Sequence, residues 1–341
     1  MKTAQYLVKT LADGQFYSGI ELGKRLNITR AAVWKQLKSL RDIGVEIEAV
    51  TGKGYRIPSG LSLLDHDSIY HQLSPISQHL LGRLNILQTV SSTNDYLLDL
   101  ARLNTRSPTI CLAERQTRGK GRRGRSWIGS YGHNIYLSLL WRFEKDLSAL
   151  GGLSLMAGVA ILKALKRYGF TGAGLKWPND VLYEGKKLAG ILIESLAQAN
   201  ECSYAVIGLG LNTFLNPNQQ VSITQPSTTL SAILHTSIDR NRLSSLLIDE
   251  LIHSILLFEK TGLKSFLKEW QSHDVTRGLW VNIHTEQQTI TGQTVGIGPQ
   301  GELKVITPNG QTLLFTSGEV SLRIPDAKSA DVSIDATVPE A

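Results

Sequence analysis

The spacing of apolar residues divides the chain into a helical N-terminal part, a long mixed middle part and a β-rich C-terminal part. In the first sixty residues the apolar positions around Leu7 have helical spacing. Two further segments with helical spacing follow at 19–26 and 30–43. Ser18 and Thr29 directly precede them, and both residue types are favoured helix N-caps. We therefore predict three short helices in this part.

A hairpin is predicted directly after the third helix. Residues 45–50 alternate like a strand, Thr51-Gly52-Lys53-Gly54 is a tight turn, and 55–57 returns. Helix, turn, helix and hairpin together are typical of a winged helix-turn-helix, which places its second helix in the DNA major groove. The residues predicted to contact DNA are Arg30, Trp34, Lys35 and Lys38 on that helix and Lys53 and Arg56 on the wing. The alternative is a solvated helix in a helical adaptor.

Strands and helices alternate in the middle of the chain, and from Leu279 onward the pattern is purely β. Helices are expected at 147–168, 242–258 and 262–270, and an apolar strand at 204–211. The fold class is therefore α+β. The predicted parts are a winged helix-turn-helix at 1–60, a central α/β domain at 65–275, a small β-barrel or sandwich at 276–325, and a disordered tail at 326–341.

Composition narrows the protein class, and the distribution of charge suggests the partners. The 341 residues exceed one compact domain, and no apolar run is long enough for a membrane span, so a cytoplasmic protein without a membrane partner is expected. Of the net charge of +7, residues 1–60 carry +5 and residues 115–125 carry +6. Two basic segments in an otherwise mildly acidic chain suggest two anionic partners, although basic runs are usually solvated surface.

A glycine- and arginine-rich segment, 118–127, is the sharpest candidate site. It contains G-x-G-x-x-G, but the residues after it do not favour a helix, so it is not a dinucleotide fingerprint. Glycine lets backbone N–H groups converge, and arginine offers forked donors to phosphate. We expect an anionic ligand to order this loop. Trp127 is placed either to stack on a nucleobase or in the core, and nonspecific nucleic-acid binding is the alternative for the loop.

Three further motifs offer polar groups to a ligand. Lys176-Trp177-Pro178-Asn179-Asp180 combines a phosphate-binding side chain with oxygen donors that suit Mg²⁺. Lys187 opens a strand beside Gly190, where a ligand can approach the backbone. Ser91-Ser92-Thr93-Asn94 precedes an apolar helix and offers hydrogen bonds to an uncharged head group. The alternatives are a polar turn, a surface lysine and a plain helix cap, respectively.

The motifs together, in their order, resemble those of the biotin protein ligases. The order is Ser-Thr-Asn at 92–94, Gln-x-x-Gly-x-Gly-Arg-x-Gly-Arg-x-Trp at 116–127, Lys-Trp-Pro-Asn-Asp at 176–180 and Lys-Leu-Ala-Gly-Ile-Leu-Ile-Glu at 187–194. With its winged helix, the chain is similar to the subgroup that doubles as biotin operon repressor. The resemblance covers about residues 5–324 and implies a central ligase domain of the biotin/lipoate type and an SH3-like C-terminal barrel.

The resemblance also implies roles for individual residues. The implied biotin-binding residues are Ser92, Thr93, Asn94, Gln116, Lys120, Gly121, Arg122 and Lys187. The implied ATP- or adenylate-binding residues are Arg122, Arg125, Trp127, Lys176, Asn179 and Asn212, with Asp180 as metal ligand and Lys187, Arg122 and Lys176 as catalytic residues. Glu319 and Arg323 fall in a run that the family shares. Position 120 is Lys where the family usually has Arg, so the bidentate fork is lost.

The reaction implied is biotin activation by ATP with Mg²⁺, then transfer of biotin to a lysine of a biotin carboxyl carrier protein. The same resemblance implies binding to operator DNA as a homodimer, with biotinyl-5′-AMP as corepressor. Two alternatives remain from the sequence: a ligand-sensing transcription factor without ligase activity, and a lipoate or octanoate ligase.

Overall fold

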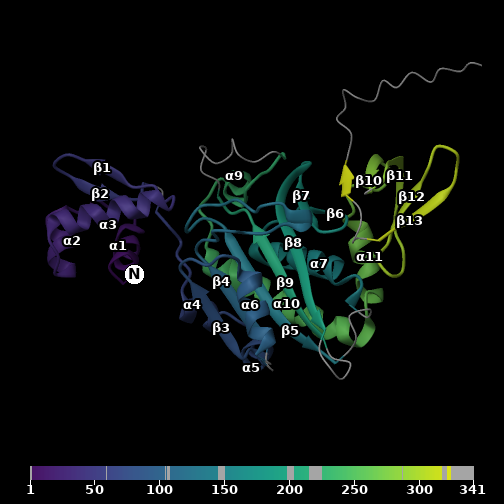
Figure 1. The fold of residues 1–341 in the computed structure, drawn as a ribbon, viewed down its shortest axis with the longest axis horizontal. Helices are drawn as coiled ribbons and strands as arrows, with labels where there is room; N and C mark the ends of the chain where they lie inside the picture. Colours follow the sequence, from purple (N-terminus) through teal and green to yellow (C-terminus); the bar gives the residue numbers. More distant parts are fainter. Residues whose placement is uncertain are drawn as a thin grey trace, which may run out of the picture.

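A computed structural model describes most of the chain in three parts arranged in a row (Figure 1). The described residues are 2–58, 60–103, 105, 108–144, 150–197, 203–214, 225–285, 287–316 and 321–323. The tail predicted to be disordered, 326–341, and Glu319 lie outside these residues. Along the described part, no helix has the length and apolar character that crossing a membrane requires.

The N-terminal part is the predicted winged helix-turn-helix. Its elements are α1 (Lys2–Leu11), α2 (Gly19–Leu26), α3 (Arg30–Asp42), β1 (Glu48–Val50) and β2 (Gly54–Arg56). The hydroxyls of Ser18 and Thr29 accept hydrogen bonds from backbone N–H groups of α2 and α3, as their predicted capping role requires. β1 and β2 pair antiparallel as the wing. A separate core, with Leu7, Leu22 and Leu37 in its centre, holds the helices together.

The central part is built on a seven-stranded mixed sheet. Its order is β3-β4-β5-β9-β8-β7-β6, and only β3 and β4 pair in parallel. The strands are β3 (Arg83–Leu87), β4 (Thr109–Ala113), β5 (Ile135–Phe143), β6 (Gly174–Lys176), β7 (Asp180–Tyr183), β8 (Lys186–Ala197) and β9 (Ser203–Leu211). Buried apolar side chains fill β4, β5 and β9, so the centre of the sheet is covered on both faces.

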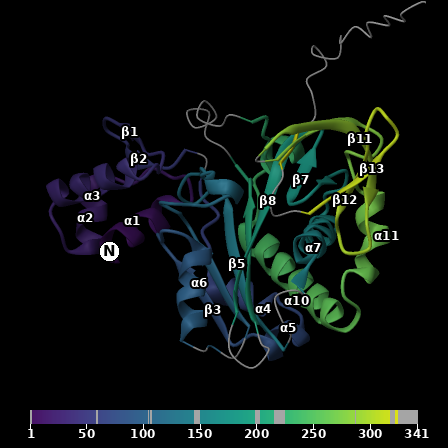
Figure 2. The same ribbon diagram turned by 45° about the vertical axis from the view of Figure 1, so that its right-hand side comes forward.

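Helices cover both faces of this sheet (Figure 2). α7 (Leu153–Tyr168) and α10 (Arg240–Thr261) pack on each other and on one face, and α6 (Thr93–Arg102) packs on the other. The remaining helices are α4 (His66–His71), α5 (Pro75–Leu80), α9 (Leu230–Leu234) and α11 (Lys264–Ser272). The predicted start of a helix at 147 was wrong, because Gly152 has a φ of 82° and is the N-cap of α7. Gly151 and Gly152 therefore precede the helix.

The C-terminal part is the predicted all-β unit. It is an antiparallel five-stranded sheet of order β13-β12-β11-β10-β14. Its strands are β10 (Trp280–His284), β11 (Thr289–Ile297), β12 (Leu303–Ile306), β13 (Thr312–Phe315) and β14 (Ser321–Arg323). The buried indole of Trp177 donates a hydrogen bond of 3.0 Å to the Gly301 carbonyl, which joins this part to the Lys-Trp-Pro-Asn-Asp motif.

Candidate active site

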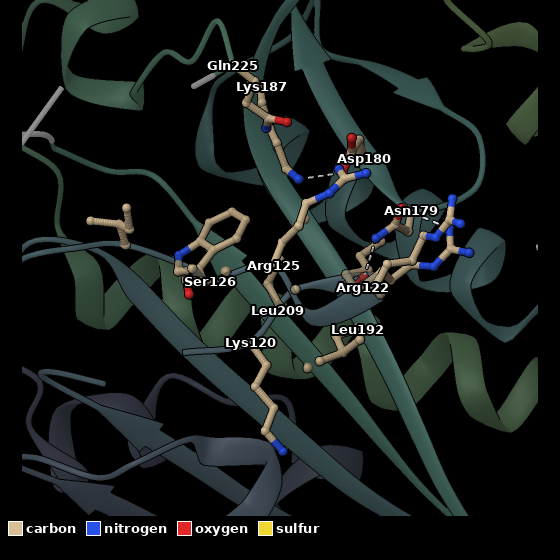
Figure 3. Close-up of a pocket in the computed structure, with 18 of the residues that line it drawn as sticks. Lys120, Arg122, Arg125, Ser126, Asn179, Asp180, Lys187, Leu192, Leu209 and Gln225 are labelled. Carbon is tan, nitrogen blue, oxygen red and sulfur yellow. Dashed lines mark hydrogen bonds and ion pairs between the residues drawn. The ribbon is translucent and has the colours of Figure 1, made fainter. Parts of the chain in front are cut away.

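The four sequence motifs meet around one pocket of about 360 Å³ over strands β8 and β9 (Figure 3). The lining residues that the sequence predicted are Ser92, Thr93, Asn94, Gln116, Lys120, Gly121, Arg122, Arg125, Trp127, Lys176, Asn179, Asp180, Lys187 and Asn212. These positions are up to 120 residues apart in the chain, and the sheet brings them together. A second hollow of about 990 Å³ shares the loop residues and extends to Ser154 and Glu194.

Glycines form the floor of the pocket. Gly190 on β8 pairs with Gly210 on β9, and the Trp127 ring lies over both. A Cβ atom at Gly190 would lie 2.8 Å from the Trp127 ring and 3.1 Å from the Lys187 nitrogen. The first separation is too short for real atoms and the second is unusually tight, so the absence of side chains at these strand positions makes room for the indole and the lysine.

The Lys187 ammonium lies 2.7 Å from a carboxylate oxygen of Asp180 and 5.3 Å from the centre of the Trp127 ring. β7 and β8 are antiparallel neighbours, so these residues of two separate motifs face each other. Both side chains are mostly buried, with 15% and 18% of their surfaces exposed. A cation and a carboxylate thus stand together at the pocket, where an anionic ligand and a metal ion would each find a partner.

A second, buried group of polar residues closes the pocket at α6. Gln116 accepts hydrogen bonds from the backbone N–H and the hydroxyl of Thr93 at 2.8 and 3.1 Å. Asn94 accepts from Ser138 at 2.6 Å and donates to Glu194 at 2.8 Å. Because these partners hold both ends of the Asn94 amide, its position is fixed before any ligand binds.

The glycine- and arginine-rich loop forms a compact turn over the pocket. Lys120 and Ser126 form an isolated β-bridge, and the backbone N–H of Trp127 donates to the Gly119 carbonyl at 2.8 Å. The tip, Arg122–Gly124, is a short 3-10 turn in which Arg123 has a φ of 58°. The Arg122 guanidinium donates a hydrogen bond of 3.5 Å to the Asn179 side chain. Burial of the guanidinium lowers the pKa of Arg122, and this effect outweighs the opposing effect of the Asp180 charge.

Lys120 is oriented differently from the arginines of the loop. Its ammonium forms an ion pair with Asp95 in the first turn of α6 and lies 3.8 Å from Glu194. The hydrogen bond to Asp95 raises the pKa of Lys120. In Figure 3 its side chain extends away from Lys187 and Asp180. The residue at which the loop departs from the usual family pattern therefore anchors the loop to α6.

Two more predicted residues, Lys176 and Asn212, also line the pocket. Lys176 ends β6, next to the buried Trp177. Asn212 follows β9, is nearly buried, and donates to the Lys187 carbonyl at 3.4 Å.

The indole nitrogen of Trp127 is buried without a hydrogen-bond partner among the described residues, which leaves a donor for a ligand.

Five of the six residues predicted to contact DNA are exposed, and Arg56 is partly buried. Arg30, Lys35 and Lys38 are exposed along α3, and Trp34 is 52% exposed, with the Lys38 ammonium 5.7 Å from its ring centre. On the wing, Lys53 is exposed, whereas Arg56 pairs with Glu48 at 2.6 Å. Arg56 therefore offers less free charge to phosphate than the prediction assumed.

Sequence reasoning missed two residues of the site. The Ser138 hydroxyl on β5 donates to Asn94 and lies 2.7 Å from the Thr93 hydroxyl, and Glu194 on β8 contacts Asn94 and Lys120. Ser138 is a single hydroxyl in an otherwise apolar strand, and Glu194 ends the fourth motif. Both signals were visible in the sequence, but their partners are 44 and 100 residues away along the chain, so only the fold shows what they contact.

Three family models match the three parts of the chain. The HTH domain matches residues 3–56, the Biotin/lipoate A/B protein ligase family matches 86–212, and the Biotin protein ligase C terminal domain matches 280–323. The fold and the site thus define a ligase of the biotin/lipoate type that is joined to a helix-turn-helix domain.

Two relatives match nearly the whole chain. The Bifunctional ligase/repressor BirA of Salmonella typhimurium is 39% identical over 93% of this chain and 96% of the relative, and that of Escherichia coli is 37% identical over the same shares. The biotin protein ligase of Aquifex aeolicus, solved with biotin and ATP, superposes with a TM-score of 0.61 at 30% identity, over 72% of this chain and 100% of that one. The chain belongs to the biotin protein ligase family, in the group that carries an N-terminal helix-turn-helix domain.

Proposed function

We propose that this protein is an ATP-dependent biotin protein ligase. It makes biotinyl-5′-AMP from biotin and ATP and then transfers biotin to a lysine of a biotin carboxyl carrier protein. The observation that carries the proposal is the convergence of Lys187, Asp180 and the arginine-rich loop on one pocket with a glycine floor. The solved Aquifex aeolicus relative, which binds biotin and ATP, supports it.

In the first step, an oxygen of the biotin carboxylate attacks the α-phosphorus of ATP and pyrophosphate leaves. Both reactants are anions, so the site must neutralise them. Lys187 would bind the biotin carboxylate and the α-phosphate, while Lys176 and Arg122 would bind the other phosphates. The polar group of Ser92, Thr93, Asn94 and Gln116 would meet the ureido ring. Trp127 and Asn212 would contact the nucleotide.

The oxygens of Asp180 and Asn179 fit Mg²⁺, which usually takes one or two carboxylates and completes its shell with phosphate oxygens and water. No cluster of three or more acidic, His or Cys side chains occurs among the described residues, so the substrate phosphates would supply the other ligands. Bound there, Mg²⁺ would screen the phosphate charges. Asp180 would hold it and also leave the Lys187 ammonium free for the substrate.

In the second step, the amine of the acceptor lysine attacks the acyl carbon of the adenylate, AMP leaves and an amide forms. Water would give the same bond cleavage, so the adenylate must be shielded until the acceptor arrives. The loop at 118–127 would provide this shield, and Lys120 would fix it to α6 through Asp95.

The ligase activity is tested by incubating the protein with biotin, ATP, Mg²⁺ and a biotin carboxyl carrier protein, followed by mass spectrometry of the acceptor. We expect one added biotin on one lysine and none on an acceptor whose target lysine is Arg. An acceptor that stays unmodified here, but is modified by the Escherichia coli relative, would contradict the proposal.

We further propose that the protein is a biotin operon repressor that binds DNA as a homodimer with the adenylate as corepressor. One winged helix has a small contact surface, whereas two would bind two half-sites. Exposed Lys35 and Lys38 on α3 support the DNA contact. Adenylate should raise both dimerisation in sedimentation and affinity for operator DNA. Lys38→Gln should lower the salt dependence of binding by about one unit, whereas Lys9→Gln on α1 should not. Unchanged dimerisation with adenylate would refute the corepressor role.

A further inference from the structure

A buried ion pair joins the ligand loop, the glycine- and arginine-rich segment 118–127, to the linker, residues 61–65, that leads to the DNA-binding domain. Arg240, the first residue of α10, lies 2.7 Å from Glu114, and their side chains are 2% and 0% exposed. Neither residue lines the pocket described above. A charge so deeply buried is costly unless many groups satisfy it, so the contacts of this pair indicate what it holds together.

The Arg240 guanidinium binds both ends of the segment that carries the loop. Glu114 directly follows β4, and the Gly132 and Asn134 carbonyls directly precede β5. Arg240 donates to these carbonyls at 3.0 and 2.7 Å. The Gly132 N–H also donates to the Glu114 carbonyl at 3.0 Å, so the two ends of the segment are tied together. Gln116, a lining residue of the pocket, is two residues from Glu114.

The same pair also binds the linker. Arg240 donates from its side chain to the Ser62 carbonyl at 3.0 Å and from its backbone N–H to the Ser62 hydroxyl at 3.1 Å. The other oxygen of the Glu114 carboxylate accepts from the Leu64 N–H at 2.6 Å. Asn241 completes the attachment, because its amide donates to the Leu63 carbonyl and accepts from the Asp65 N–H, both at 2.8 Å.

The linker residues in turn pack on the helix-turn-helix. Leu61 and Leu63 lie against its apolar core together with Tyr131, the residue before Gly132. The Leu61 N–H donates to the Ala12 carbonyl at the end of α1 at 2.9 Å. The buried ion pair therefore contacts the loop ends and the linker, and the linker with Tyr131 contacts the DNA-binding domain.

We propose that Arg240 is a positioning residue that couples the ligand loop to the DNA-binding domain through the linker. Its donors are shared among three segments, so the removal of one acceptor leaves a buried charge unsatisfied and shifts the others. A ligand that reorders the loop then changes the contacts of Arg240 and Glu114 with the linker. By linkage, a change in the linker alters ligand affinity by the same factor.

The test perturbs the linker without touching the loop or the pocket. Asn241→Ala removes the contacts to Leu63 and Asp65 only. It should raise the KM for biotin about tenfold, a typical coupling between sites, with kcat unchanged, and speed tryptic cleavage at the arginines of 115–125. Asp249→Asn is the matched control: Asp249 is buried on the same helix, but its hydrogen bonds go to Ser74 and its ion pair to Arg167. It should lower thermal stability and leave KM and loop cleavage unchanged.

Wild-type KM and loop cleavage in Asn241→Ala would overturn the proposal, as would equal changes in Asp249→Asn, which would mark a general loss of stability. Glu114→Gln, which keeps the shape of the side chain, should change both readouts at least as much as Asn241→Ala. The KM readout rests on the proposed ligase function, but the tryptic readout does not. If the wild-type protein fails to activate biotin, the ligase proposal fails. Tryptic cleavage of the loop then still tests the coupling role of Arg240.

Discussion

The Lys187 ammonium and the Asp180 carboxylate neutralise each other across β7 and β8, at 2.7 Å and largely shielded from solvent. In this state neither residue offers its full charge to a ligand. A substrate carboxylate or phosphate would replace Asp180 as the partner of Lys187, and a metal ion would replace Lys187 as the partner of Asp180. Because the two exchanges support each other, anion and metal binding should be cooperative.

Lys187→Gln should reduce biotin-dependent pyrophosphate exchange by about 10²–10³-fold, the usual loss when one group that stabilises a charged transition state is removed. The exchange rate at saturating ATP measures this. Lys186→Gln is the control, because Lys186 is adjacent on β8 but exposed. An equal loss in both variants would remove Lys187 from its proposed role.

Gly190→Ala should weaken ligand binding. Its Cβ would lie 2.8 Å from the Trp127 ring and 3.0 Å from the Lys187 chain, so both must move. We expect the KM for biotin and for ATP to rise at least about tenfold, since an overpacked site typically costs 1–3 kcal/mol. Gly292→Ala on β11 is the control, because its added methyl group would lie 2.5 Å from Val305 in the C-terminal sheet and Gly292 does not line the pocket. It should leave both KM values unchanged, and a similar rise there would refute the role of the floor.

Asp95→Asn should loosen the loop. The Lys120 and Asp95 side chains are 43% and 33% exposed, so the pair contributes at most about 1 kcal/mol, and its loss should raise release of free adenylate up to about fivefold. Capture of the released adenylate by added lysine-rich protein measures this. Asp99→Asn serves as control, because Asp99 pairs with Arg102 on the same helix. Unchanged release in Asp95→Asn would show that the pair does not hold the loop.

His133 should make folding stability depend on pH. Burial, aided by the charge of Arg240, lowers the pKa of His133 to about 4 from 6.5. The unfolded chain therefore binds the proton more readily, so this stabilisation is complete above pH 6.5 and is lost as pH falls toward 4. The loss amounts to about 3 kcal/mol at most. Urea unfolding at several pH values should show a smaller slope for His133→Gln. An equal slope in both proteins would exclude His133 as the cause.

The periodic segments and the motifs of the site could be predicted from local sequence, and the start of α7 could not. Ser18 and Thr29 cap the helices they precede, because capping depends only on neighbouring residues. The sequence before α7 is also apolar, but the positive φ of Gly152 stops the helix from extending toward the N-terminus. Glycine adopts positive and negative φ about equally, so its conformation could not be predicted from the sequence.

Long-range partners were also out of reach. Three contacts depend on how the sheet and helices pack: Lys120 with Asp95, Ser138 with Asn94, and Arg240 with the three segments it joins. Motif spacing identifies which residue types gather at a site. The direction of each side chain follows from packing, so the motif that implies a biotin-binding role for Lys120 does not show that its ammonium pairs with Asp95.

The most direct measurement of the central claim is exchange of labelled pyrophosphate into ATP in the presence of biotin, with lipoate as the control acid. Exchange with biotin and not with lipoate is the predicted result, because the reverse of adenylation needs only the pocket, ATP and the bound acid. No exchange with either acid, in a folded protein that binds biotin, would contradict the account and identify the central domain as a ligand sensor.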